Sequence, residues 1–121
     1  MVNRLLLFVL CIISAPLPAD VPESQKPEVQ HLLDFVGQTD CLMIRNGSEH
    51  DGKKAVSHIQ TKYDYFRDDI KSTEDFIEYS ATKSTMSGKY YTVKCPGREE
   101  IRSQDWLLEE LGKFRKQRGQ E

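Results

Sequence analysis

The stretch Lys89–Cys95 (KYYTVKC) is predicted to form a β-strand, because β-branched and aromatic side chains make up most of it. The shorter stretch Cys41–Arg45 (CLMIR) has the same apolar character and predicts a second strand. Turn dipeptides follow both stretches, Asn46-Gly47 after the first and Pro96-Gly97 after the second. The two strands are therefore short, and each ends at a defined point.

The first nineteen residues are predicted to form a secretory signal peptide. Arg4 supplies a short positive segment, and Leu5–Ile13 (LLLFVLCII) is an apolar run of nine residues. A membrane-spanning helix needs about 20 apolar residues, so this run is too short to cross a bilayer. The small residues Ala15 and Ala19 follow, as in a cleavage zone, and we expect cleavage after Ala19. The alternative interpretation is a buried N-terminal helix.

Cleavage would remove Cys11 and leave two cysteines, Cys41 and Cys95. Two cysteines in an exported chain most simply form one disulfide, which would close a loop of 54 residues here. A catalytic thiol and a zinc site are the competing interpretations. However, the chain has no CxxC motif, and no further ligands stand at metal-binding spacing. We therefore predict a structural disulfide, no metal and no cofactor.

The predicted disulfide also sets the register of the two strands. If the cysteines face each other in an antiparallel pair, Met43 lies opposite Val93 and Arg45 lies opposite Tyr91. Apolar and aromatic residues then meet across the strands, which is the matching that stabilises a sheet.

Four segments with apolar residues at helical spacing are predicted to form helices. The expected N-caps are Asp51 or Ser48 for the second helix, Ser72 for the third and Ser103 for the fourth. The predicted fold class is α+β, with about four helices packed on a short two-stranded antiparallel sheet closed by one disulfide. After the signal peptide (1–19), the expected organisation is a leader (20–27), a single domain (28–117) and a frayed tail (118–121).

The charge balance excludes one class of partner. The chain has 17 Lys and Arg residues against 19 Asp and Glu residues, a net charge of −2 and a pI near 5.9. Nucleic-acid binding depends on an excess of positive charge that neutralises phosphates, and this chain has none. We therefore expect no nucleic-acid partner, and no membrane span after signal cleavage.

Three runs of the sequence resemble the YfeK-like family of small exported bacterial proteins, a domain of unknown function. They are RNGSEHDGKKAVSHIQTKYDYF (45–66), TEDFIEYSATKSTMSGKYYTVKC (73–95) and SQDWLLEELGKFR (103–115). The resemblance covers about residues 28–117. It implies a bacterial, periplasmic protein, and it brings no established activity.

Six polar residues are predicted to gather at one end of the domain, where the strand, the second helix and the loop before the second strand meet. They are Arg45, His50, His58, Lys62, Ser84 and Ser87. Such a patch would bind a carboxylate, a phosphate or an acidic protein surface. The alternative is structural: His58 would hydrogen-bond a loop, Lys62 would lie over Tyr63, and the serines would shape the turn before Gly88.

Two classes of function follow from these observations. The first is a small periplasmic interaction module, such as an inhibitor, an immunity-like factor or an envelope accessory. Its partner would be a periplasmic or envelope protein, or a small anionic ligand. The alternative is a small hydrolase or ligand sensor centred on His58. No residue is predicted to be catalytic, because no catalytic motif occurs in a suitable context.

Overall fold

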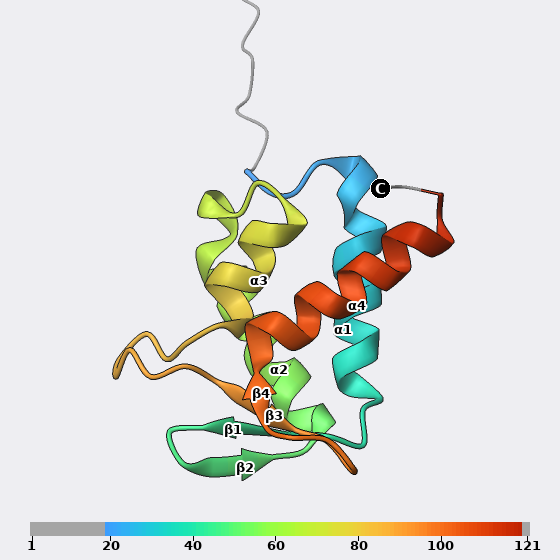
Figure 1. Cartoon of the computed structure of the whole chain (residues 1–121). Helices are drawn as coiled ribbons and strands as arrows, with labels where there is room; N and C mark the ends of the chain where they lie inside the picture. The colour runs from blue at the N-terminus through green and yellow to red at the C-terminus, as the bar shows by residue number, and fades with distance from the viewer. Residues whose placement is uncertain (1–18, 120–121) are drawn as a thin grey trace, which may run out of the picture.

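The computed structural model describes residues 19–119, and all but the last residue of the predicted signal peptide lies outside this range. The described residues form four α-helices and four β-strands. In chain order the elements are α1 (Lys26–Gly37), β1 (Leu42–Arg45), β2 (Ser48–His50), α2 (Gly52–Phe66), α3 (Thr73–Ala81), β3 (Thr92–Lys94), β4 (Ile101–Arg102) and α4 (Ser103–Gln117). The four helices pack against one another, with α4 crossing in front of α1, and the sheet lies at one end of the helices (Figure 1). The α+β prediction is confirmed. None of the helices in residues 19–119 has the length and apolar character needed to cross a membrane.

The sheet has four antiparallel strands in the order β2-β1-β3-β4, so the prediction of two strands was wrong. The first added strand arises at Asn46-Gly47, where both residues have positive φ angles, 49° and 80°. Turns of this kind match the twist of a hairpin, so the chain returns at once and pairs as β2. The second added strand, β4, is the short segment that leads into α4. The sequences of β2 and β4 contain too few apolar residues to predict a strand from composition.

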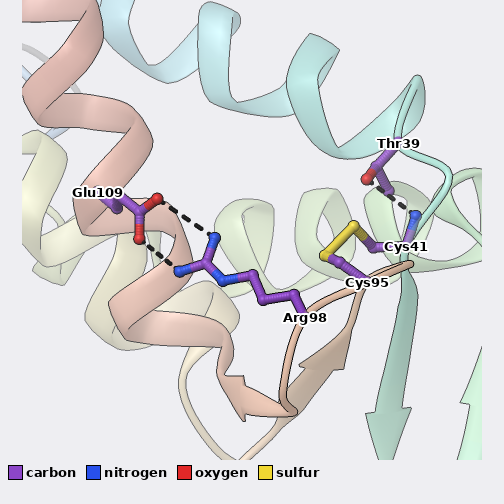
Figure 2. The surroundings of a disulfide bond; sticks show 5 residues. All are labelled: Thr39, Cys41, Cys95, Arg98 and Glu109. Carbon is purple, nitrogen blue, oxygen red and sulfur yellow. Dashed lines mark hydrogen bonds and ion pairs between the residues drawn. A yellow bond between two sulfur atoms is a disulfide. The ribbon is translucent and has the colours of Figure 1, made fainter.

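The predicted disulfide and register are both present. Cys41 and Cys95 are bonded, with their Cα atoms 4.2 Å apart. Met43 pairs with Val93, as predicted, and both side chains are buried. Figure 2 shows that Arg98, in the turn after β3, forms an ion pair with Glu109 of α4 beside this bond. At this end of the sheet, the disulfide therefore links the ends of β1 and β3, and the ion pair links the turn after β3 to α4.

Two of the three expected helix caps are confirmed. The Asp51 carboxylate accepts a hydrogen bond from Lys54 N at 2.9 Å at the start of α2, and the Ser72 hydroxyl accepts one from Asp75 N at the start of α3. The prediction that Ser103 caps α4 was wrong. Arg102 occupies the N-cap position, and no side chain caps the helix. Ser103 is the first helical residue and is fully buried, and its backbone N donates to the Tyr91 carbonyl at 2.9 Å.

The segment predicted as a leader packs on the domain. Residues Glu23–Gln25 form a turn of 3-10 helix, and Val21 is buried in the hydrophobic core. The Asp20 carboxylate accepts hydrogen bonds from the Tyr63 hydroxyl and from Arg67, both near the end of α2. The domain therefore begins before residue 28, since these contacts tie the segment to α2.

Candidate functional site

Tyr91 is the centre of the polar residues at one end of the domain. It lies one residue before β3 and is only 3 % exposed. Its backbone N donates to the Thr82 carbonyl, after α3, and its carbonyl accepts from Ser103 N of α4. Its hydroxyl lies 3.1 Å from His58 Nε2 and 3.4 Å from Lys62 Nζ. Burial raises the pKa of Tyr91, so its hydroxyl remains protonated.

His58 connects Tyr91 to Arg45. Its Nδ1 lies 2.8 Å from Arg45 Nη1. Because a guanidinium only donates, Nδ1 must accept, and the ring proton is on Nε2, which donates to the Tyr91 hydroxyl. Burial lowers the pKa of His58, and the charges of Arg45, Lys62 and His50 add to this effect, so that the pKa is about 4. His58 is therefore neutral near neutral pH.

Lys62 lies one helical turn after His58 on α2 and is 9 % exposed. Its Nζ donates to the Lys83 carbonyl at 2.8 Å and lies 5.1 Å from the centre of the Tyr91 ring. Burial lowers the pKa of Lys62, and the nearby charge of Arg45 lowers it as well. The aliphatic part of this side chain is inside the domain, and so is its charged end.

Arg45, His58, Lys62 and Tyr91, which we call the Tyr91 cluster, contain two cations and no acid. Among residues 19–119, no carboxylate forms an ion pair with Arg45 or Lys62. In the same part of the chain, Arg45 Nε is buried without a hydrogen-bond partner. Buried cations in proteins are ordinarily paired with acids. The cluster therefore carries positive charge that the described residues do not balance.

The two predicted serines lie beside the cluster and organise a loop. Ser87 Oγ donates to Asn46 Oδ1 at 2.7 Å, and Ser84 Oγ accepts from Ser87 N at 3.2 Å. Asn46 Nδ2 also lies 3.4 Å from Ser84 Oγ. These contacts fix the loop before β3 against the β1–β2 turn, which explains why the chain returns to the Arg45 end of the sheet.

The position of His50 differs from that of the other predicted residues. It lies on β2, opposite Met43, and makes no side-chain hydrogen bond with a described residue. Burial lowers the pKa of His50, and the charge of Arg45 contributes to the same shift. The charge of Arg45 therefore reaches His50, but the His50 side chain makes no hydrogen bond with Arg45, His58, Lys62 or Tyr91.

A cleft of about 430 Å³ adjoins the cluster, and Lys62 belongs to both. Its lining residues come from α2, α3 and the loop before β3: Lys62, Phe66, Glu78, Tyr79, Lys83, Ser84, Thr85 and Gly88. Sequence reasoning missed Tyr91, Phe66 and Tyr79 as parts of this region. The predicted register placed Tyr91 opposite Arg45, and this was the signal that could have identified it.

The chemistry available at the cluster is recognition of negative charge. Both ring nitrogens of His58 are already hydrogen bonded, and the Ser84 hydroxyl contacts Asn46 and Ser87. The described residues therefore offer no serine that is hydrogen bonded to a histidine base. Residues 19–119 also contain no group of three or more His, Cys, Asp or Glu side chains that would hold a metal ion.

Comparison with known proteins gives a family and no activity. Residues 23–115 match the model of a family of unknown function, DUF5329. The chain is also similar to a protein described as uncharacterized protein YfeK, from Salmonella typhimurium strain LT2. The two are 32% identical over 84 residues, which cover 69% of this chain and 70% of the Salmonella protein. No solved structure matches the chain.

Proposed function

The chain belongs to the DUF5329 family of unknown function, and on this premise we propose that it is a small periplasmic binding module for an anionic ligand. The Tyr91 cluster would receive the negatively charged group of this ligand. The observation that carries the proposal is that Arg45 and Lys62, which are linked through His58 and Tyr91, form no ion pair with a carboxylate among residues 19–119.

A bound anion would offset the electrostatic cost of holding Arg45 and Lys62 without an acidic partner among residues 19–119. Burial lowers the pKa of Lys62, and the positive charge of Arg45 lowers it as well, so both disfavour the charged form of Lys62. A carboxylate or phosphate bound to Lys62 would supply the missing counter-charge and accept a charge-assisted hydrogen bond. His58 and Tyr91 fix the positions of both side chains in advance, which reduces the entropy that binding would cost.

The predicted signal peptide (1–19) and the disulfide support a periplasmic location, because disulfides persist in oxidising compartments. Mass spectrometry of the protein from a periplasmic fraction should give a chain that begins at Asp20. A cytoplasmic pool that retains Met1 would contradict this part of the proposal.

The alternative of a hydrolase centred on His58 has less support. A general base needs a free nitrogen within reach of the proton that it removes. His58 Nδ1 accepts from Arg45, and Nε2 carries the ring proton and donates to Tyr91. His58 thus acts here as a positioning residue.

The test is a titration of the ¹⁵N-labelled protein with sodium acetate or sodium phosphate, at an ionic strength held constant with sodium chloride. Binding should produce saturable shifts of amide resonances at Lys62, Lys83 and Ser84. The variant Lys62→Met should lose these shifts, whereas Lys53→Met, which removes an exposed charge from the same helix, should retain them. Shifts that do not saturate, or that survive in Lys62→Met, would contradict the proposal.

A further inference from the structure

We propose that the ligand is a small organic acid with one carboxylate and an apolar body, bound in the cleft between α2, α3 and the loop before β3. This inference rests on the proposed function and adds the chemical class of the ligand. Three properties of the cleft carry it: a buried cation on one side, two aromatic rings on another, and one carboxylate in its lining.

The cationic side of the cleft is a built site. The Lys62 ammonium group has three N–H donors, of which one is directed to the Lys83 carbonyl and one to the Tyr91 hydroxyl. The described residues thus leave one donor of a nine-tenths buried cation unused in the lining of a cleft. The side chain of Lys83 is exposed and lines the same cleft, so a second positive charge stands at its edge.

The apolar side consists of Phe66 and Tyr79, whose ring centres lie 5.6 Å apart. Tyr79 is 38 % exposed, although it is a large aromatic residue on α3. Aromatic surface left in contact with water gains free energy when an apolar group covers it. An inorganic anion would not use this surface, whereas an organic acid would cover it while its carboxylate meets Lys62.

The size and charge of the cleft further restrict the chemical class of the ligand. A volume of about 430 Å³ falls within the roughly 300–1,000 Å³ of pockets that hold small molecules. Glu78 also lines the cleft, where its carboxylate accepts a hydrogen bond from Gln104 Nε2 at 2.7 Å. This negative charge opposes a second acidic group on the ligand. We therefore expect a monoacid to bind in preference to a diacid.

The experiment measures dissociation constants by NMR titration for 4-phenylbutyrate, its uncharged analogue 4-phenylbutyramide, and acetate. The phenylbutyrate should bind at least about tenfold more tightly than either of the other two, because only it uses both sides of the cleft. Tyr79→Ser should weaken phenylbutyrate binding and leave acetate binding unchanged. Lys62→Met should weaken the binding of phenylbutyrate and of acetate. Lys83→Met should also weaken the binding of both ligands, but by a smaller factor. Leu108→Ser, which removes an exposed apolar side chain of α4 outside the cleft, is the control and should bind as the unchanged protein does.

The outcomes separate this inference from the proposed function. If acetate binds at Lys62 and phenylbutyrate binds no more tightly, the organic-acid class is wrong and anion binding stands. If the amide binds as tightly as the acid, the cleft recognises only apolar groups, and the inference is overturned. If neither acetate nor phenylbutyrate binds, the proposed function fails as well. If N-acetyl-alanyl-phenylalanine binds more tightly than phenylbutyrate, the ligand is the C-terminus of a peptide, and the inference of a small organic acid is overturned.

Discussion

Acidification between pH 7 and pH 4.5 should destabilise the domain through His58. In the unfolded chain this histidine gains a proton near pH 6.5, whereas in the fold burial and the charges of Arg45, Lys62 and His50 delay protonation to about pH 4. The unfolded state therefore binds more protons in this window, so the stability that is fully present above pH 6.5 is lost as the pH falls towards 4. A shift of this size corresponds to about 3 kcal/mol at most. Because His58 is partly exposed, we expect about 1–2 kcal/mol.

The assay is urea unfolding at a series of pH values for the unchanged protein and for His58→Gln. The variant should be less stable at pH 7, because its shorter amide does not reproduce both hydrogen bonds, and it should lose less stability on acidification. Lys53→Met, which changes an exposed residue of α2 outside the Tyr91 cluster, is the control and should show the same acid loss as the unchanged protein. Parallel loss of stability in His58→Gln and the unchanged protein would refute the reasoning.

Three further predictions concern stability, each measured by urea unfolding. The double replacement Cys41→Ser/Cys95→Ser should lower the free energy of unfolding by about 2–5 kcal/mol, and no loss would mean that the disulfide is dispensable. Lys62→Met should raise the free energy of unfolding or leave it within about 1 kcal/mol, because the variant removes an unbalanced buried charge. A loss of several kcal/mol would show that the Lys62 charge is well solvated or paired. Glu28→Gln should destabilise by about 1–3 kcal/mol, because the buried Glu28 carboxylate accepts two hydrogen bonds from Arg115, and an unchanged stability would show that this pair contributes nothing.

The parts of the fold that were predicted correctly are those in which local chemistry and tertiary contacts agree. Asp51 and Ser72 are good helix caps by residue type, and the structure uses both. The register followed from the cysteine pair, because a disulfide between antiparallel strands leaves only one alignment.

The errors arose where tertiary contacts override local preference. Ser103 has the residue type of a cap, yet burial of its backbone against Tyr91 places it inside the helix. The strand β2 is polar and exposed, so only the turn conformation at Asn46 and Gly47 produces it. Val21 is a single apolar residue between Asp20 and Pro22, and nothing local indicates that it enters the core.

The candidate site was predictable in part. The helix flank brought His58 and Lys62 together, and the strand pairing added Arg45. The sequence did not reveal that Tyr91 joins them or that an aromatic cleft adjoins Lys62, because both depend on how α3 and its following loop pack against α2.

The pKa of Lys62 is the quantity that tests anion binding at the Tyr91 cluster most directly. It can be followed through the side-chain ¹³Cε and ¹⁵Nζ resonances, with and without saturating acetate. In the free protein the pKa should lie below the ordinary 10.5, because burial and Arg45 both disfavour the charged form. Acetate should raise it, since a neighbouring negative charge favours the ammonium form. A pKa of Lys62 that is ordinary in the free protein, or that does not change when acetate is added, would contradict the account.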